Sequence, residues 1–419
     1  MKLNRRETLG GALAASAVLS APAAIGAARP KAVVIGGGAG GGTAARYIAK
    51  DSKGEIDVTL IEPSRTYYTC FFSNLYIGGF RTLDSIAHSY GTIARQGVNV
   101  VHDWATGVDR DAKTVALAGG GNVPYDRLVV APGIDFRWDS IPGYSLAGQH
   151  AMPHAWKAGS QTELLKAQIE SMPEGGLFVM VPPPNPYRCP PGPYERVSMV
   201  AHLLKEKNPS AKIMVFDPKA KFSKQTLFEN GWAAHYPDMV EWIDGEFSTV
   251  EEVRPETMEV VVDGEPVKAD AANVIPAQKA GLVAEAAGLT DDSGFCPIVP
   301  ATMQSRMDEN IHVLGDATIA GDMPKSAYSA NSQAKVAAMS VRASLTGSKA
   351  FPARFANTCW SLIATDDGVK VGARYEATED KIAKTEGFIS QTDEDAATRK
   401  ATYDESLGWY EGITADIFG

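Results

Sequence analysis

Cysteine is scarce in this chain, and its spacing excludes several kinds of site. The 419 residues include only four cysteines, Cys70, Cys189, Cys296 and Cys359. No two of them form a C-x-x-C pair, which disfavours zinc ribbons and thioredoxin-like redox motifs. No C-x-x-C-H motif occurs, so the chain attaches no c-type haem of its own. We therefore interpret each cysteine by its own surroundings.

Positive charge is also in short supply. Forty Lys and Arg stand against 50 Asp and Glu, a formal net charge of -10, which excludes nucleic acid and anionic membrane surfaces as natural partners. Beyond residue 28 no uninterrupted apolar run is long enough to cross a bilayer. With 44% hydrophobic and 21% charged residues, the chain has the composition of a soluble globular protein. Its length predicts two or three domains.

The first 28 residues predict a twin-arginine export signal. Residues 4–9 read Asn-Arg-Arg-Glu-Thr-Leu, a weakly charged Ala/Gly/Leu stretch follows, and small residues surround positions 21–23 and 27–28. The alternative is a flexible basic tail. Because this route carries folded proteins, the signal predicts a periplasmic protein whose cofactor is inserted before export.

A glycine-rich motif near the N-terminus predicts a dinucleotide site. Residues 31–36 read as a buried strand, and Gly36, Gly38 and Gly41 then form G-x-G-x-x-G before a helix over 43–50. These glycines permit a tight turn, close approach of a pyrophosphate and close packing of helix on strand. A second strand ends at Glu62, where an acid meets the adenosine ribose.

A second motif specifies FAD as the dinucleotide. Residues 310–317 form a strand that ends in Gly315-Asp316, ahead of a helix over 329–345. In two-dinucleotide flavin reductases an aspartate at this place holds the ribityl chain, and the helix N-terminus faces the flavin ring. The strand over 128–133 resembles the one by which those enzymes leave the first domain.

A second nucleotide-binding frame is present without its glycine loop. Residues 175–181 and 212–217 read as strands and 198–205 as a helix, but seven prolines stand between the first strand and the helix. Proline has no amide donor and fixes φ, so the loop suits a pyrophosphate badly and NAD(P)H is an unlikely reductant. The loop instead forms a stiff arm around Cys189. The alternative is that Cys189 is an ordinary loop thiol.

These motifs together resemble the flavoprotein subunit of flavocytochrome c sulfide dehydrogenase, of the same superfamily as sulfide:quinone oxidoreductases. The similarity runs over essentially all of the chain after residue 28. It rests on the first glycine motif and on a set of short segments: Tyr67–Cys70, Arg188–Arg196, Gly315–Ala317, Pro324–Ser326, Asn331–Gln333 and Asn357–Cys359.

The resemblance implies a role for three of the four cysteines. Cys70 matches the residue that carries FAD covalently, and Cys189 and Cys359 match the pair that forms a redox disulfide over the flavin. The alternatives are a free structural thiol for Cys70 and a bracing disulfide for the pair. Cys296 has a counterpart without an assigned role and is interpreted as a packed apolar residue.

The resemblance also implies oxidation of sulfide to sulfur or polysulfide. Hydrosulfide would attack the disulfide by thiol exchange, and two electrons would pass to FAD. Glu195 is a candidate proton carrier, with a helix N-terminal acid as the alternative. Reduced flavin can release single electrons, so the expected partner is a haem-bearing cytochrome c subunit. Trp409 and Tyr410 match an aromatic segment that covers the site or merely packs.

The predicted fold class is α/β, with two Rossmann-like dinucleotide-binding domains and a C-terminal α+β interface domain. The expected limits are 29–143 plus 275–345 for the FAD domain, 144–274 for the nucleotide-like domain and 346–419 for the interface domain. Rival functions are a sulfide:quinone oxidoreductase, a flavin and disulfide redox sensor, and a pyridine-nucleotide disulfide reductase.

Overall fold

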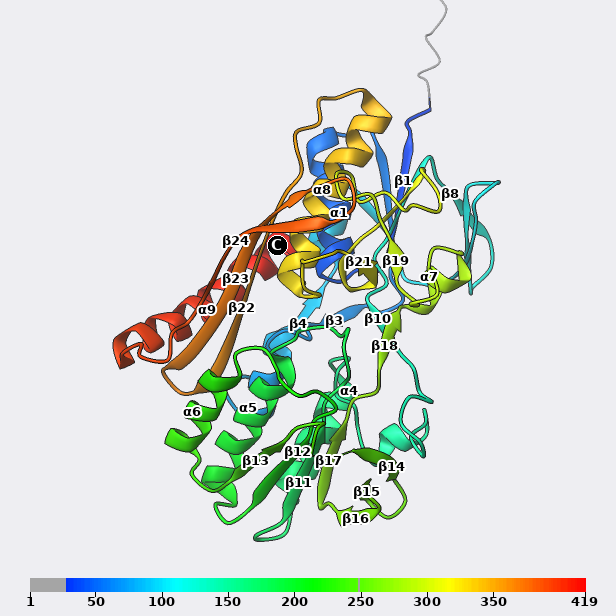
Figure 1. The fold of residues 1–419 in the computed structure, drawn as a ribbon. Helices are drawn as coiled ribbons and strands as arrows, with labels where there is room; N and C mark the ends of the chain where they lie inside the picture. Colours follow the sequence, from blue (N-terminus) through cyan, green and yellow to red (C-terminus); the bar gives the residue numbers. More distant parts are fainter. Residues whose placement is uncertain (1–27, 248) are drawn as a thin grey trace, which may run out of the picture.

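The protein is described by a computed structural model that covers residues 28–247 and 249–419. The predicted export signal falls almost wholly outside the described residues and stays a prediction. Figure 1 shows three parts: a sheet with its helices drawn in blue and yellow, a second in green, and an orange sheet with the red helix α9 beside both.

The first part is a parallel sheet in the order β20-β9-β1-β2-β5. Its strands are nearly all apolar because both faces are covered, as parallel sheets require. Helices α1 and α8 pack side by side on it. The bounds are β1 Lys31–Ile35, β2 Asp57–Ile61, β5 Val98–Val101, β9 Arg127–Val130, β20 Ile311–Val313, α1 Ala39–Ser52 and α8 Ala327–Thr346.

The second part repeats this plan with a parallel sheet in the order β13-β12-β11-β17. A core of buried apolar side chains joins the sheet to its helices. The bounds are β11 Leu177–Val181, β12 Lys212–Phe216, β13 Val240–Ile243, β17 Ala271–Val274, α4 Ser160–Glu170, α5 Gly192–Lys207 and α6 Gln225–His235.

The third part is an antiparallel sheet of β22 (Arg354–Ala364), β23 (Asp367–Ala377) and β24 (Ile382–Ile389), with α9 (Ala396–Phe418) packed along β23. The end of α9 returns to the first part, where Asp416 accepts hydrogen bonds from Asn331 and Tyr47 at 2.9 and 2.8 Å. The predicted α/β fold class is confirmed.

Smaller elements connect these sheets, and strands β10 and β18 run between the first and second parts (Figure 1). Their bounds are β3 Thr66–Tyr68, β4 Ala87–Ser89, β6 Ala105–Asp109, β7 Thr114–Leu117, β8 Asn122–Pro124, β10 Ile134–Phe136, β14 Val250–Arg254, β15 Glu259–Val262, β16 Glu265–Lys268, β18 Gln278–Ala280, β19 Cys296–Pro297, β21 Thr318–Ile319, α2 Ser73–Ile77, α3 Gly91–Arg95, α7 Leu282–Ala286, η1 Asp84–Ile86, η2 Gly148–His150 and η3 Gly315–Ala317.

Several predicted element limits near the site were wrong. Helices α1, α5 and α8 begin at Ala39, Gly192 and Ala327, earlier than the predicted 43, 198 and 329. In α5 the reason is Pro193, which stands in the first turn, where a missing N–H costs nothing. The predicted strand over 310–317 is shorter, because Gly315 at φ 76° turns the chain out of β20.

None of the helices within the described residues is both long and apolar enough to span a bilayer. The predicted domain limits are not decided by the sheets and stay a prediction.

Candidate flavin and thiol site

The glycine motif leaves no room for side chains at the turn between β1 and α1. A Cβ on Gly36 would lie 2.3 Å from the carbonyl oxygen of Ala131, and one on Gly41 would lie 1.8 Å from that of Gly36. Gly36 also has φ 93°, a region that favours glycine. Gly38 lines a cavity of about 200 Å³ above this turn. The backbone here has the close approach that a dinucleotide pyrophosphate needs.

Two acids lie on the walls of this cavity. Glu62, at the end of β2, accepts a 2.8 Å hydrogen bond from the backbone N–H of Gly37. Asp316 follows Gly315 in η3, and its Oδ1 is buried without a hydrogen-bond partner. Burial raises the pKa of Asp316, although Arg188 lies 3.9 Å away. An orphaned acceptor in a nucleotide cavity fits a ribityl hydroxyl, so these residues fit FAD.

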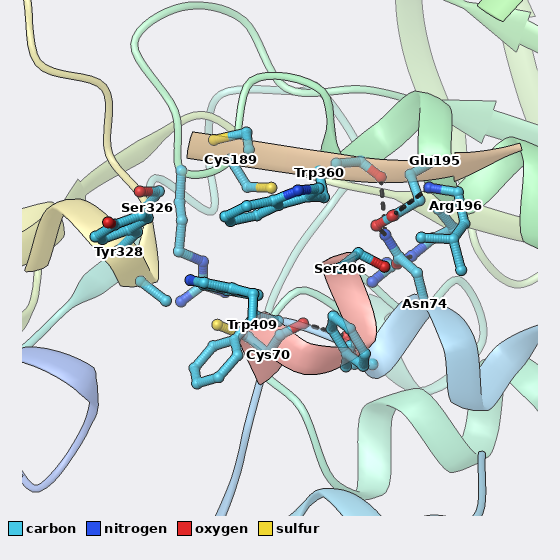
Figure 2. Close-up of a pocket in the computed structure, with 18 of the residues that line it drawn as sticks. Cys70, Asn74, Cys189, Glu195, Arg196, Ser326, Tyr328, Trp360, Ser406 and Trp409 are labelled. Carbon is cyan, nitrogen blue, oxygen red and sulfur yellow. Dashed lines mark hydrogen bonds between the residues drawn. The ribbon is translucent and has the colours of Figure 1, made fainter. Parts of the chain in front are cut away.

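A second cavity of about 80 Å³ lies against the first. Cys70, Cys189, Cys359 and Glu195 all line it, although they come from four separate segments. Figure 2 shows Cys189 on the upper side of the cavity, Cys70 and Trp409 on the lower side, and the Trp360 ring between them. The two cavities share four lining residues, Cys70, Phe71, Arg188 and Ala327. The residues of the first cavity would hold the nucleotide of FAD, and the thiol cavity adjoins it at these four residues.

The proline arm holds Cys189 by its backbone. The residue has φ 59°, an uncommon conformation for a side chain with a Cβ, and its N–H donates to the carbonyl of Lys325 at 2.8 Å. Gly192 N–H closes the turn on the Cys189 carbonyl at 2.8 Å. A Cβ on Gly192 would lie 2.9 Å from the Cys189 sulfur and 2.8 Å from the Trp156 ring. The backbone of Cys189 is therefore fixed, and its sulfur packs against a glycine that leaves room for it.

The neighbouring Arg188 ties the arm to the other parts. Its N–H donates to Gln278 Oε1 at 2.9 Å, and its guanidinium donates to the carbonyl of Trp156. The same side chain lines both cavities and faces Asp316. A positive charge thus lies where the nucleotide and thiol cavities meet.

Cys359 lies on β22 with its thiol turned into the same cavity. Asn357 Nδ2 approaches its sulfur at 3.4 Å, and Ser326 donates to Asn357 Oδ1 at 2.5 Å. Burial raises the pKa of both Cys359 and Cys189, the latter well above its usual value. Both cysteines are free thiols in this structure, so their disulfide stays a prediction.

Glu195 does not cap its own helix. Its two carboxylate oxygens accept hydrogen bonds from Asn74 Nδ2 at 2.8 Å and from the Leu362 N–H at 3.0 Å, as the dashed lines in Figure 2 mark. Arg196 supports Asn74 from behind with a 2.9 Å bond to its Oδ1. Burial raises the pKa of Glu195. The carboxyl group thus lines the cavity with a raised pKa, and its role as a proton carrier stays a prediction.

Aromatic side chains form the rest of the wall. Trp360 and Trp409 have ring centroids 5.1 Å apart, and Tyr328 stacks on Trp360 at 6.4 Å. Tyr410 points away and stacks on Phe72 at 4.3 Å. Of the two C-terminal aromatics, Trp409 therefore lines the cavity and Tyr410 packs behind it.

The second nucleotide-binding unit keeps a cavity of about 190 Å³ beside the prolines, but the acid on its wall is held by protein groups. Asp217, the acid after β12, is buried and accepts hydrogen bonds from Tyr194 at 2.5 Å and Trp242 at 3.1 Å. Lys219 pairs with it at 2.6 Å and donates to the carbonyl of Pro183 at 2.7 Å. Asp217, the acid that would meet a ribose, is thus linked to the proline arm through Lys219. The loss of NAD(P)H binding at this unit stays a prediction.

Cys296 lies elsewhere, fully buried in β19 within the core of the first part. Burial raises its pKa to about 12, as expected for an inert packed thiol. In the part of the chain that the structure describes, no group of three or more His, Cys, Asp or Glu side chains is placed to hold a metal ion.

Sequence reasoning missed several residues that surround the thiols. Asn74, Trp360 and the buried Lys224 belong to no motif that stands out in a single sequence, and Arg196 ends the segment 188–196 without any sign there of its role. Arg196 and Lys224 are charged side chains that are only 1% and 5% exposed. Such burial appears only once distant segments are packed together.

The fold and site define a class: flavin-dependent oxidoreductases built on two dinucleotide-binding units. Residues 30–168 match the pyridine nucleotide-disulphide oxidoreductase family. Sulfide:quinone oxidoreductase from the hyperthermophilic bacterium Aquifex aeolicus has the same fold, with a TM-score of 0.73 and 16% identity over 92% of each chain. The NAD-dependent persulfide reductase from A. fulgidus is also similar in fold, with a TM-score of 0.62 and 18% identity. The match covers 90% of this chain and 77% of that chain.

Two further matches narrow the class. Residues 162–276 match the central domain of the sulfide dehydrogenase (flavocytochrome c) flavoprotein chain, and residues 351–418 match the flavin-binding domain of flavocytochrome c sulphide dehydrogenase. The chain therefore carries the central and flavin-binding domains of that flavoprotein family, and the resemblance seen in its sequence is confirmed. A curated relative, mitochondrial sulfide:quinone oxidoreductase of Dictyostelium discoideum, is 22% identical over 315 residues, 73% of this chain and 69% of its own.

Proposed function

We propose that this protein oxidises sulfide through a Cys189–Cys359 disulfide and FAD attached to Cys70, and that it passes the electrons to a c-type cytochrome subunit. The observation that carries the proposal is the single cavity lined by Cys70, Cys189, Cys359 and Glu195, which shares four lining residues with the cavity above the glycine motif. Its product is sulfur or polysulfide.

The chemistry of the thiol pair starts with exchange. Hydrosulfide attacks one sulfur of the disulfide, the S–S bond breaks, and one cysteine becomes a persulfide while the other leaves as a thiolate. Two electrons have then moved from the substrate sulfur into the cysteine pair. Bound FAD supplies the acceptor for this electron pair.

The chain's own residues prepare this exchange. Glu195, with its raised pKa, takes the proton that hydrogen sulfide or the persulfide releases. The Trp360 and Trp409 rings keep bulk water from the sulfurs, and the arm keeps Cys189 in one position. Such fixed placement lowers the entropy that the reaction step must lose.

The covalent link is tested by acid precipitation of the holoprotein. Cys70 lines both cavities, so it lies where the nucleotide cavity adjoins the thiol cavity. We expect the yellow colour to stay with the pellet, and to move to the supernatant in Cys70→Ala. Release of flavin from the unaltered protein would contradict the attachment.

The acceptor is tested by reduction with sulfide in a stopped-flow instrument, followed by cytochrome c or a quinone analogue. We expect fast reoxidation by cytochrome c, because the chain resembles a flavocytochrome flavoprotein. A sulfide:quinone oxidoreductase is the second candidate, favoured by the fold of the Aquifex aeolicus enzyme. Against it, the apolar side chains of α9 are turned into the protein: Tyr410, Ile413, Ile417 and Phe418 are all buried. Faster reoxidation by the quinone would favour this candidate.

Export to the periplasm is part of the same proposal and rests on the twin-arginine pattern of residues 4–9. An oxidising compartment lets a disulfide persist. Cell fractionation of the full chain, with Arg5 and Arg6 replaced by Lys as the matched control, tests it. The unaltered chain should appear in the periplasm and the control in the cytoplasm.

A further inference from the structure

A buried lysine stands behind the thiol cavity and has no part in the chemistry described so far. Lys224 precedes α6 in the second part of the fold and is only 5% exposed. Its backbone has φ 64°, which is uncommon for a residue with a Cβ. Buried lysines without a partner carboxylate are rare. The position therefore calls for a functional explanation.

The ammonium group reaches across to the strand that carries Cys359. Lys224 Nζ donates to the Cys359 carbonyl at 3.1 Å and to Ser361 Oγ at 2.8 Å, and it approaches the Val369 carbonyl at 3.5 Å. Cys359 and Ser361 are two residues apart on β22, so their side chains point to the same face. All three groups that hold the ammonium are neutral.

No salt bridge in the described residues neutralises Lys224. The charged or ionisable groups around it are Cys359 on β22, Glu195 on α5, Cys189 on the arm and Arg399 on α9. Glu195 is held by Asn74 and Leu362, and Arg399 pairs with Asp367 at 2.6 Å. Burial lowers the pKa of Lys224 to about 8, and a thiolate at Cys359 opposes that shift.

We propose that Lys224 is a positioning residue whose ammonium charge stabilises the thiolate of Cys359. This inference rests on the proposed function and deepens it. The two sulfurs then differ: Cys359 has the Asn357 amide at 3.4 Å and an ammonium held by its own carbonyl at 3.1 Å. Cys189 has Arg188 as a cation and interacts with the same ammonium more weakly than Cys359 does. The sulfur with the more stable thiolate is the better leaving group in disulfide exchange.

The difference in thiolate stability between Cys359 and Cys189 decides which of the two sulfurs forms the bond to hydrosulfide. Hydrosulfide attacks the Cys189 sulfur, the S–S bond breaks, Cys189 becomes the persulfide, and Cys359 leaves with the electron pair as a thiolate. Atoms and charge balance, since one anion enters and one thiolate is released. The lysine acts from the second nucleotide-binding unit on a cysteine of the C-terminal sheet.

The test measures thiol ionisation rather than turnover. Reduced holoprotein is alkylated with iodoacetamide across a pH series, and modification of Cys359 and Cys189 is followed by peptide mass spectrometry. Lys224→Gln keeps hydrogen-bond donors but removes the charge, and Lys224→Arg keeps the charge. Lys166, whose Nζ donates to the Ile77 carbonyl at 2.9 Å, gives the matched control Lys166→Gln.

In Lys224→Gln we expect the alkylation of Cys359 to require a higher pH, and its rate at pH 7 to fall about tenfold, because less of the thiol is ionised. Alkylation of Cys189 should change less. Lys224→Arg and Lys166→Gln should match the unaltered protein. A folded, flavin-loaded Lys224→Gln with an unchanged Cys359 profile would overturn the proposal and assign Lys224 a structural role.

Failure of the proposed function gives a different result. If sulfide does not reduce the flavin of the unaltered protein, the function is wrong whatever the thiol profiles show. If sulfide reduces it and the profiles do not move, only the role of Lys224 is wrong.

Discussion

The two nucleotide-binding units of this protein have the same frame and opposite loops. After β1 the chain turns through glycines whose backbone lies open to a pyrophosphate, and after β11 it turns through a proline arm that ends in α5. The acids after β2 and β12, Glu62 and Asp217, each line a cavity. Glu62 accepts hydrogen bonds from backbone N–H groups, whereas Asp217 is bound to the side chains of Tyr194, Trp242 and Lys219. The two units thus share a frame and differ in the loop that follows its first strand.

The largest expected effect comes from removing a sulfur from the arm or from β22. Cys189→Ser or Cys359→Ser should slow reduction of the flavin by sulfide about 1000-fold or more, because the exchange needs both sulfurs. Flavin content should not change. Stopped-flow absorbance of the flavin measures the rate, with the buried Cys296→Ser as control. Equal loss in all three variants would show a folding defect instead.

The second largest expected effect is the loss of bound flavin when a glycine of the first loop is replaced. In Gly41→Ala the new Cβ would lie 1.8 Å from the Gly36 carbonyl oxygen, so the turn must move and FAD binding should be largely lost. The flavin-to-protein absorbance ratio checks this. Gly408→Ala is the matched control, because its Cβ meets nothing within 4 Å. A loaded Gly41→Ala protein would contradict the role of the first loop.

The third expected effect is a loss of stability when the ion pair that supports the proline arm after β11 is removed. Asp217→Asn removes the charge that pairs with the buried Lys219, which should cost about 3 kcal/mol of unfolding free energy. Denaturant unfolding measures it, against the exposed Asp393→Asn as control. The variant should gain no reduction by NADH, because the prolines still lack amide donors. A gain of NADH reduction would break the contrast between the two units.

A smaller effect tests the position of the Cys189 sulfur. In Gly192→Ala the new methyl group would lie 2.9 Å from that sulfur, so the thiol must shift within the cavity. Displacement on the order of 1 Å can slow a reaction about 100-fold. Reduction by sulfide should fall by about that factor while bound flavin stays constant. An unchanged rate would show that the arm need not hold the sulfur in one place.

The smallest effect concerns the proton carrier and its pH dependence. Burial raises the pKa of Glu195 in the folded protein, so the folded state binds a proton more tightly than the unfolded state. Stability from this group is therefore present at low pH and is lost as pH rises from the unfolded value through the folded one. In Glu195→Gln the pH dependence of the melting temperature should be flatter over that window. A parallel curve for the two proteins would remove Glu195 from this role.

Much of this site was predictable from the sequence. The glycine motif and the Gly315-Asp316 pair each carry a local physical reason, so their cavity could be expected before any coordinates. Cys189 was singled out by the prolines around it. By contrast, no neighbouring residue in the sequence indicates a role for Lys224. Its role follows from its contact with Cys359 on β22, more than a hundred residues later.

The limits of elements near the site were harder to predict, because a proline can either end a loop or begin a helix. Helix α5 begins at Gly192 because a proline fits its first turn and because glycine leaves room for the Cys189 sulfur. Read locally, Pro193 looks like part of the loop. The turn formed by the Gly192 N–H and the Cys189 carbonyl, followed by a proline in the first helical turn, decides where the helix starts.

The most direct test of the contrast between the two loops is a side-by-side anaerobic reduction of the holoprotein. Flavin absorbance is followed after mixing one sample with sulfide and an identical sample with NADH. The two loops predict rapid bleaching by sulfide and none by NADH on the same timescale. Bleaching by NADH, or an unchanged flavin in the presence of sulfide, would contradict the replacement of a nicotinamide site by a sulfur site.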